Sequence, residues 1–551
     1  MSLPRTIRDL RLPLGHTEED LAEAVARSAG RPTDSMIAGD FRIIRQSIDA
    51  RHPQAISWLY NIELDPAPWS LAGVRGLLPP AAGLAEPARL PVSPVRRPAG
   101  SPRPVVVGAG PAGLFAALYL AMAGLAPLVI ERGRPVDARQ TDVARFWQSG
   151  RLDPDSNVQF GEGGAGAFSD GKLTTGIKDS RCRAILEELA LLGAPADILY
   201  LAKPHIGTDN LCLVVQKLRA KILSLGGEFR FNCCLTGLQY DRRNRLTGLT
   251  CADRNNDARP LQLELPVKRL ILAVGHSARD TFAWLARLPL HLEPKPFSLG
   301  VRIEHLQAQI DRRQYGAWAG HPQLPPADYK LACHLPSGRS VYTFCMCPGG
   351  QVVAASSEPE SVVTNGMSRY SRGQDNANSA LLVGVDPDDF PEPGPLGGVS
   401  WQRGIERQAY CLGGGNYRAP AERIGSFLGA ASGGCPPVPL QPGSSGDPQP
   451  TYRPGVTWCH LADCLPALVH RALQEALPLL GRRFPGFAAP GSVLTGVETR
   501  SSSAVRICRD EQLQAALSGL YPCGEGAGYA GGIMSAAADG LRCAEAVLLQ
   551  D

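Results

Sequence analysis

Residues 105–131 read VVVGAGPAGLFAALYLAMAGLAPLVIE, and this stretch decides the fold around it. A short apolar run, Val105–Val107, leads into a glycine-rich turn. A helical pattern over Leu114–Ala123 follows, and a second apolar run, Leu128–Ile130, ends on Glu131. The order strand, glycine turn, helix, strand and acid is that of a βαβ unit that binds a dinucleotide. A membrane span is the alternative for so apolar a stretch, but four glycines, two prolines and the lack of a second hydrophobic span argue against it.

The glycines of this turn have separate roles in such a unit. Gly108 allows the tight turn, Gly110 lets the backbone approach a pyrophosphate, and Gly113 lets helix and strand pack closely. The first helical N–H groups then point at the phosphates. Glu131 lies 23 residues after Gly108, where a carboxylate can accept both ribose hydroxyls of an adenosine. The residues expected to bind the dinucleotide here are Gly108, Gly110, Pro111, Ala112, Gly113, Glu131 and Arg132.

Composition limits the class of protein. A chain of 551 residues is long enough for two or three domains. A net charge of +4, from 56 Lys and Arg against 52 Asp and Glu, gives no strong field for polyanions, so nucleic acid is not a favoured partner. The first fifteen residues have no apolar segment typical of a signal peptide. The fifteen cysteines are scattered without zinc-site spacing. These features predict a cytoplasmic protein with reduced thiols, no metal site and no membrane association.

The chain begins with what we expect to be a small α+β module, residues 1–86. Thr6–Leu12 alternates like a strand, and Thr17 with Asp20 can cap a helix that runs to about Ala29. Phe41–Ile48 and Ile56–Leu64 are rich in β-forming residues, with Trp58 and Tyr60 expected in the core. Residues 87–104 hold six prolines and predict a stiff connector.

The rest of the chain alternates between two predicted domains. Residues 105–290 are expected to form the first part of a Rossmann-like α/β domain, and residues 456–551 its C-terminal part. Residues 291–455 predict an inserted, mainly β substrate domain that ends in a loop. The segments that carry these predictions are a helix over Asp209–Leu225, a strand over Glu228–Leu235, a strand over Lys268–Val274 that runs into Gly275, and strands over Ser298–Ile303, Val341–Cys345 and Gln351–Ser356. Leu235 is expected among the dinucleotide-binding residues, and Cys233 with Cys234 in strand packing.

Gly108–Glu131 resembles the N-terminal FAD motif of the flavoproteins related to glutathione reductase and p-hydroxybenzoate hydroxylase. Leu270–Gly275 fits the later strand and glycine turn of that class. Gly524-Glu525 fits its C-terminal glycine-acid pair, with Glu in place of the usual Asp. The resemblance implies FAD as the cofactor. It also implies that Glu525 accepts a ribityl hydroxyl and that a helix starting at Gly531-Gly532-Ile533 points at the flavin. Gly275, Gly524, Glu525, Gly531, Gly532 and Ile533 therefore join the expected FAD-binding residues.

Further motifs resemble a family known as uncharacterised FAD-dependent dehydrogenases, and the likeness spans most of the chain. The resemblance implies the family and the cofactor but no substrate. The segments that carry it are Asn157–Leu173, Gly275–Asp280, Lys295–Ser298, Arg302–His305, Phe344–Gly350, Asn365–Ser368, Gly524–Gly532 and, in the N-terminal module, Ser47–Arg51.

Three residues are candidates for catalysis: Lys172, His276 and Cys345. Lys172 follows a glycine loop (Gly161, Gly163, Gly164, Gly166) that we expect to line the pyrophosphate and the isoalloxazine. The Lys172 cation would stabilise negative charge on the reduced ring or pair with a phosphate. The alternative is a glycine-rich turn with a solvated lysine. His276 follows the turn at Gly275, so it either donates a proton or orders a loop. Nearby, Arg279 and Asp280 are expected to pair with each other, and His305 is expected to be structural.

Cys345-Met-Cys347 suggests a redox pair. In a strand, however, a C-x-C sequence points both thiols to one face with their Cα atoms about 7 Å apart, too far for an easy bridge. Packing, or a place in the wall of the substrate pocket, is therefore favoured over a catalytic dithiol.

Together these features predict an FAD-dependent oxidoreductase that transfers a hydride through flavin N5 to or from an unidentified small molecule. The sequence has no second Gly-x-Gly-x-x-Gly unit in a strand–helix context. Electrons would therefore come from the substrate, from NAD(P)H bound transiently, or from a protein donor. One alternative is an RNA-modifying flavoenzyme with the N-terminal module as RNA reader, but residues 1–104 hold only 13 Arg and Lys against 11 Asp and Glu. Another is a non-catalytic FAD sensor or scaffold. The oligomeric state is left open.

Overall fold

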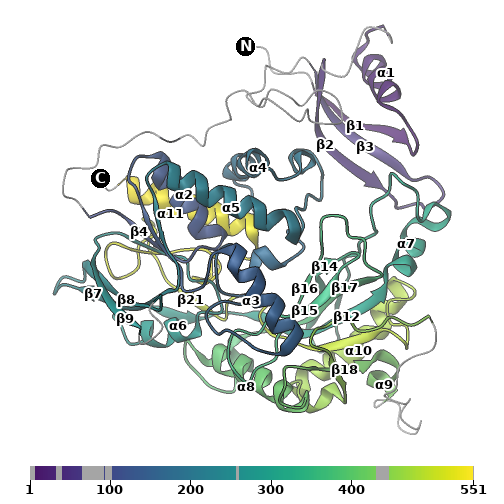
Figure 1. Ribbon diagram of the computed structural model, residues 1–551. Helices are drawn as coiled ribbons and strands as arrows, with labels where there is room; N and C mark the ends of the chain where they lie inside the picture. Colours follow the sequence, from purple (N-terminus) through teal and green to yellow (C-terminus); the bar gives the residue numbers. More distant parts are fainter. Residues whose placement is uncertain are drawn as a thin grey trace.

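The computed structural model describes residues 6–32, 40–64, 92, 102–255, 260–429 and 446–549. Within these ranges the chain is a mixed α/β protein with several sheets (Figure 1). Most of the predicted proline-rich connector lies outside the described residues, as does much of the predicted loop after residue 433.

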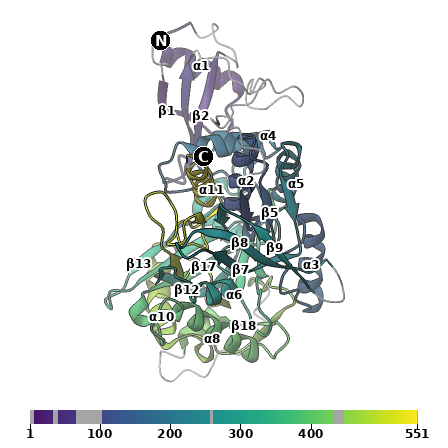
Figure 2. The same cartoon turned by 90° about the vertical axis from the view of Figure 1, so that its left-hand side faces the viewer.

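The N-terminal module has the predicted β-α-β-β order. Its elements are β1 (Thr6–Pro13), α1 (Glu18–Ala29), β2 (Phe41–Asp49) and β3 (Ser57–Leu64), and the antiparallel sheet has the order β1-β3-β2. Thr17 and Asp20 form the expected capping box on α1. Tyr60 is buried and Trp58 packs against the same core. The module lies at one end of the molecule beside α4 (Arg181–Leu191), as Figure 2 shows.

A five-stranded parallel sheet forms the centre of the second unit. Its strands, in spatial order, are β22 (Leu520–Pro522), β10 (Leu270–Leu272), β4 (Val105–Val107), β5 (Leu128–Ile130) and β6 (Glu228–Arg230). Alternate residues face opposite sides, as the two-residue period of a strand requires. Val106 and Val129 pack with three helices, α2 (Pro111–Met122), α5 (Thr208–Ser224) and α11 (Ile533–Leu548). These helices lie together on one face of the sheet (Figure 1).

The other face of this sheet packs on a three-stranded antiparallel sheet. Its strands are β7 (Cys233–Tyr240), β8 (Leu246–Asp253) and β9 (Leu261–Pro266). The predicted single strand over Glu228–Leu235 is therefore wrong: it is divided between β6 in the parallel sheet and β7 in the antiparallel one. The physical reason is Asn232, whose positive φ of 54° turns the chain between the two strands.

A seven-stranded sheet forms the third unit. Its order is β13 (Ala332–His334), β14 (Ser340–Cys347), β17 (Asn376–Val385), β12 (Phe297–Leu306), β20 (Val493–Glu498), β18 (Ala419–Arg423) and β19 (Val456–Trp458). The boundary expected at residue 455 needs correction, because β19 and β20 belong to this sheet. The antiparallel pairing of β20 with β12 holds it there, and the chain returns to the parallel sheet only at β22.

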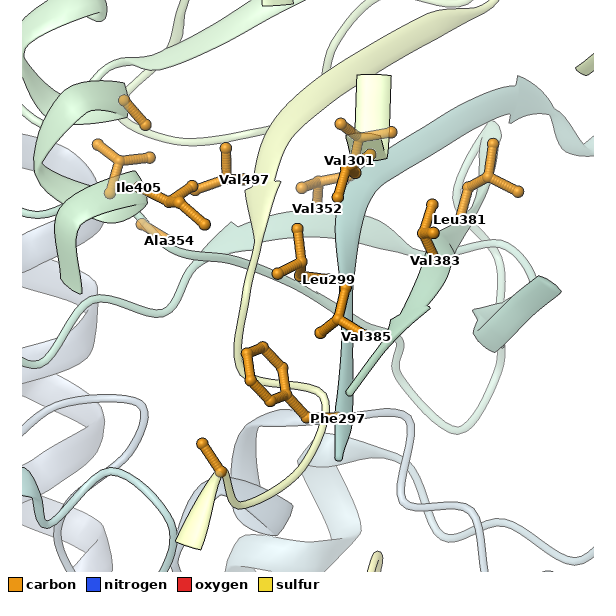
Figure 3. Packing of buried hydrophobic residues seen from close by; sticks show 14 of the residues in the cluster. Phe297, Leu299, Val301, Val352, Ala354, Leu381, Val383, Val385, Ile405 and Val497 are labelled. Carbon is orange, nitrogen blue, oxygen red and sulfur yellow. The ribbon is translucent and has the colours of Figure 1, made fainter. Parts of the chain in front are cut away.

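The core of the third unit is formed by buried side chains of this sheet, of helix α10 (Ala467–Arg483) and of a smaller hairpin, β15 (Gln351–Ala354) with β16 (Thr364–Met367). Figure 3 shows side chains of β12, such as Leu299 and Val301, among those of β17, with Val352 of β15 and Ile405 of α8 (Gly397–Leu412) close by. The remaining elements are the paired strands β11 (Leu292–Pro294) and β21 (Val505–Ile507), and the helices α3 (Val136–Ser149), α6 (Arg279–Leu285), α7 (Gln307–Tyr315) and α9 (Ile424–Gly429).

None of the helices in the described part of the chain combines the length and apolar character needed to cross a bilayer.

Candidate functional site

A cavity of about 630 Å³ lies where the parallel sheet meets the seven-stranded sheet. Four of the parallel strands end at its wall: the residues just after β4, β5, β10 and β22 all line it. Ligands of open α/β sheets bind at the carboxyl ends of the strands, so this is the expected place for a binding site. The remaining wall comes from the glycine loop before Lys172 and from β14.

The turn after β4 has the tight geometry expected from its glycines. Gly108 has a φ of +99°, and a Cβ atom there would lie 2.2 Å from the carbonyl oxygen of Ala273. A Cβ atom on Gly113 would lie 1.8 Å from the carbonyl oxygen of Gly108. Side chains at either position would therefore clash with backbone. Gly110 is the N-cap of α2, whose N-terminus faces the cavity.

The glycine loop packs directly on this turn. The Gly163 amide donates to the carbonyl of Ala109 at 2.8 Å, and a Cβ atom on Gly164 would lie 3.0 Å from the Cα atom of Gly110. Arg139 of α3, which is fully buried, holds the loop from behind. Its guanidinium donates to the carbonyls of Asn157, Val158, Gly161, Glu162 and Gly164 at 2.7–3.2 Å.

Arg139 was missed from the sequence, although a signal for it exists. Val136, Arg139, Val143 and Phe146 share the helical spacing of one buried face of α3. An arginine at such a position must have many hydrogen-bond partners, because an unpaired buried charge is costly.

Glu131 lies at the cavity wall after β5 and is 6% exposed. Its carboxylate accepts from the amides of Ala109, Gly133 and Gly161 at 2.7, 2.9 and 3.0 Å. A carboxylate has about four acceptor positions, so one remains for a ligand hydroxyl. The three amides also hold both oxygens in fixed positions beside the turn.

The expected Arg279–Asp280 pair is wrong. Asp280 accepts from Arg132 at 2.7 Å, and Arg132 stacks on the ring of Phe160. Arg279 is buried and donates to Glu406 of α8. The two residues follow each other at the start of α6, where successive side chains point in different directions, so each finds its partner in a separate segment.

The C-terminal part of the wall comes from the segment after β22 and the start of α11. Glu525, Gly531, Gly532 and Ile533 line the cavity. Removal from water raises the pKa of Glu525 to about 7, although the cation of Lys295 acts in the opposite direction. Gly524 does not reach the cavity; its amide donates to Asp539 at 2.8 Å. α11 therefore directs its N-terminus, with its unpaired amides, at the cavity.

Lys172 lines the cavity beside β14, in the part of the wall that we name the Lys172 end, and Arg372 shares its partner Asp170. The Lys172 Nζ atom lies 2.8 Å from a carboxylate oxygen of Asp170 and also donates to the carbonyl of Met346. Asp170 is buried and pairs with Arg372 as well, at 2.7 Å. Burial opposes the charged form of Lys172 and so lowers its pKa. The neighbouring Cys347 and Asp170 outweigh this effect, and the pKa of Lys172 is raised. Lys172 and Arg372 therefore share the carboxylate of Asp170.

His276 lines the same cavity next to a buried charge cluster. Its Nδ1 atom lies 3.2 Å from the Ser277 hydroxyl, which in turn accepts from Arg500 at 3.1 Å. Desolvation and the cations of Arg500 and Arg279 lower the pKa of His276 to about 3. The imidazole is therefore neutral near pH 7. The two roles expected for His276, proton donation and ordering of a loop, both stay predictions.

Cys345 lines the cavity from β14. The pairing of β14 with β17 shifts between Phe344 and Cys347, and Cys345 has a φ of +43°. The expectation of a regular strand at Cys345-Met-Cys347 is therefore wrong. His305 is structural as expected: it is buried, and its Nε2 atom lies 2.7 Å from the carbonyl of Phe487.

Most residues expected at the site do line the cavity. They are Gly108, Gly110, Pro111, Ala112, Glu131, Arg132, Gly164, Lys172, Leu235, Gly275, His276, Cys345, Glu525, Gly531, Gly532 and Ile533. Gly113, Gly163 and Gly524 lie behind the wall and shape its turns. Arg372, Arg500 and Asn365 line the cavity without having been singled out. Asn365 lies within a motif of the resemblance, whereas Arg372 and Arg500 lie outside all of these motifs.

Comparison with known proteins establishes the family. The chain is 47% identical over 448 residues to an uncharacterized protein of Clostridium beijerinckii, and the match covers 81% of this chain and 80% of that protein. This chain belongs to the same family. Residues 296–501 match the family described as FAD-dependent protein, C-terminal domain-like, and residues 4–65 match a domain of unknown function (DUF8436). The first match begins at β12 and ends just after β20, in agreement with the corrected boundary.

Two solved structures are also similar. A flavin-dependent brominase is 14% identical, covers 81% of this chain and 79% of its own, and has a TM-score of 0.36. A geranylgeranyl bacteriochlorophyll reductase-like protein from Thermoplasma acidophilum is 13% identical, covers 82% and 79%, and has a TM-score of 0.35. Both scores are low, so neither similarity assigns an activity to this chain.

Proposed function

We propose that this chain is an oxidoreductase that holds FAD in the cavity, with a Rossmann-like domain of the glutathione reductase and p-hydroxybenzoate hydroxylase type around the parallel sheet. One observation carries the proposal: a single cavity is bounded by the glycine turn, by Glu131 and by the N-termini of both α2 and α11. The two helix ends suit the two polar parts of a flavin dinucleotide, the pyrophosphate and the carbonyl edge of the ring. The match to an FAD-dependent family supports the same cofactor.

The residues present fit FAD. A Cβ atom built on Gly275, Gly531 or Gly532 would meet no heavy atom within 4 Å, so these backbones are open to a ligand. The cavity volume of about 630 Å³ lies within the range of cofactor sites. Glu131 would hold the adenosine ribose beside Leu235, α2 would hold the pyrophosphate, and Glu525 with the start of α11 would hold the ribityl chain and the ring.

When bound, FAD supplies hydride transfer at its N5 atom. The protein's own contribution is electrostatic and steric. Lys172 with Arg372 holds positive charge near the reacting end, which stabilises an anionic reduced cofactor. Neutral His276 acts as a hydrogen-bonding group without net charge. Phe344, Met346 and Tyr329 line the cavity and reduce the access of water to the reacting atoms.

The substrate in this proposal is a small molecule that enters the end of the cavity near Lys172. The electron donor is either this substrate or NAD(P)H, which would bind only transiently. A flavin-dependent RNA modification and a non-catalytic FAD sensor are the competing functions, and each predicts a different outcome in the experiment below.

The test is purification of the chain, release of any bound flavin, and anaerobic stopped-flow mixing of the flavin-loaded protein with NADH, NADPH and a panel of metabolites. We expect FAD at close to one per chain and rapid bleaching of its absorbance by one donor. A chain that binds no FAD would refute the proposal. Bound FAD that no donor reduces would favour the sensor, and salt-sensitive binding of total RNA would favour the RNA-modifying enzyme.

A further inference from the structure

Cys345 and Cys347 lie where β14 passes the cavity, and the backbone there is irregular. On β14, three positions separate Phe344 from Cys347, whereas their partners on β17, Ala380 and Asn378, are two apart. The strand therefore carries a bulge with one extra residue. Cys345 takes the left-handed conformation, which costs a non-glycine residue about 1 kcal/mol or more and occurs often at functional sites.

The bulge places the thiol of Cys347 against the backbone of Cys345. The Cys347 thiol donates to the carbonyl oxygen of Cys345, with the Sγ atom 3.3 Å from that oxygen. Both are free thiols. The distance that argues against a C-x-C bridge belongs to a regular extended strand, and this segment is not one.

The surroundings favour a thiolate at Cys345. The neighbouring Cys347 thiol has the largest effect and lowers the pKa of the Cys345 thiol. Burial opposes this shift, and the cations of Lys172 and Arg302 add to the lowering. Arg302 is fully buried and donates to the carbonyl of Cys345 at 3.0 Å. Lys172 donates to the carbonyl of Met346, between the two cysteines. The thiolate is the form that attacks in thiol chemistry.

The pair also occupies the wall that we assign to the flavin ring. A Cβ atom on Gly166 of the glycine loop would lie 3.1 Å from the Ile533 side chain at the start of α11. Lys172, at the end of that loop, contacts the backbone of Met346. The loop, the start of α11 and Cys345 thus form neighbouring parts of one wall. Cys345 faces the cavity, and Cys347 lies fully buried behind it.

We propose that Cys345 and Cys347 form a redox-active dithiol that exchanges an electron pair with FAD in the cavity. The inference rests on the proposed function. In one direction the Sγ–Sγ bond forms as the S–H bond of Cys347 breaks. Two electrons and that proton pass to oxidised FAD, and the negative charge of the Cys345 thiolate ends on the reduced FAD. In the other direction reduced FAD returns the electron pair and the proton, and the disulfide opens. The pair would give each chain a second two-electron store beside the cofactor.

The test counts electrons in the flavin-loaded protein. The protein is treated with a mild thiol oxidant, freed of it, and titrated anaerobically with dithionite. We expect two electron pairs per FAD in the natural chain and one pair in Cys345→Ser and in Cys347→Ser. Cys182 is a half-buried cysteine of α4 that does not line the cavity. Cys182→Ser is therefore the matched control and should keep two electron pairs. If the natural chain binds one FAD and accepts only one electron pair, the dithiol inference is wrong and the proposed function stands. If the chain binds no FAD, both the inference and the proposed function are wrong.

Two further measurements separate a redox role from simple packing. Trypsin cleavage after Arg339 and Arg369 yields one peptide whose only cysteines are Cys345 and Cys347. After mild oxidation it should lose two hydrogen atoms in mass and resist alkylation until reduced; free alkylation of both thiols would refute the bridge. In Cys347→Ser the Cys345 thiolate remains at the cavity, so a broad long-wavelength charge-transfer absorption with oxidised FAD is expected. Its absence, or its appearance in Cys345→Ser, would contradict the assignment of Cys345 as the thiol that faces the flavin.

Discussion

The two ends of the cavity are built in different ways. The end at Glu131 is made largely of backbone: glycine turns, amide groups and one carboxylate, mostly from a single βαβ unit. The end at Lys172 is made of charged and polar side chains from distant segments, including Asp170, Arg372 and Cys345. A backbone site is specific for the shape of a cofactor shared by many enzymes, and a side-chain site can change with the substrate. The difference suggests that binding and chemistry can be perturbed separately.

Arg139 offers the strongest way to break the binding end. Replacement by Met leaves five loop carbonyls without their donor, and we expect a loss of about 3–5 kcal/mol in stability together with loss of FAD. The measurements are the thermal midpoint of the FAD-free protein and the FAD content after gel filtration. Arg145→Met on the same helix is the control. Arg145 is 47% exposed, and its buried partner Asp142 keeps a second ion pair with Arg134, so the loss should cost about 1 kcal/mol or less. Equal effects of the two changes would contradict the role of Arg139.

The same contrast explains what the sequence could predict. The determinants of the binding end lie within 105–131, and glycines at fixed spacing report directly on backbone geometry. Both strands were therefore predicted at their observed bounds, and the start of the helix was predicted three residues late. The other end depends on tertiary contacts. The period of two that defines a strand contains no sign of the bulge at Cys345, and the apolar pattern of β20 does not reveal which sheet it joins. Asn232 divides a predicted strand through one backbone angle that has no hydrophobic signature.

Lys172 provides the sharper test at the reacting end. We expect Lys172→Met to leave the affinity for FAD nearly unchanged but to make the reduction potential of the bound flavin more negative. Loss of one charge-assisted contact would destabilise the reduced flavin, relative to the oxidised flavin, by about 1.5–3 kcal/mol. The measurement is equilibrium reduction against a dye of known potential.

Lys203→Met is the matched control for this change. Lys203 also lines the cavity but is 71% exposed and paired with Asp328, so its charge is screened by water. Loss of FAD from Lys172→Met, or an equal potential shift in both variants, would show that Lys172 does not act on the reduced cofactor.

Glu131→Ala should have the reverse effect of Lys172→Met: it should change the affinity for FAD and not the potential of the flavin. Removal of the carboxylate should weaken FAD binding by about 1.5–3 kcal/mol, or roughly 10- to 100-fold in Kd, because the ribose loses its acceptor. The potential of the flavin that remains bound should stay near that of the natural protein, since the ring lies at the other end. Fluorescence titration of the FAD-free protein measures the Kd. Glu264→Ala, on the exposed edge strand β9, should leave it unchanged. Full FAD retention in Glu131→Ala would refute the assignment of the adenosine.

The smallest expected effect is on the pH dependence of stability, and it comes from Glu525. Its pKa is raised to about 7 in the folded protein, from an ordinary value of 4.5. A raised pKa means that the folded state binds the proton more tightly, so the contribution of Glu525 to stability is full below pH 4.5 and is lost as the pH rises to 7. We therefore expect the thermal midpoint of the FAD-free protein to fall over this interval by a few degrees more than in Glu525→Gln, with the two proteins equal near pH 4.5. The exposed change Glu511→Gln should follow the natural protein throughout. Parallel pH profiles for the natural protein and Glu525→Gln would mean that Glu525 is solvated, and its place at the cavity wall would then have to be abandoned.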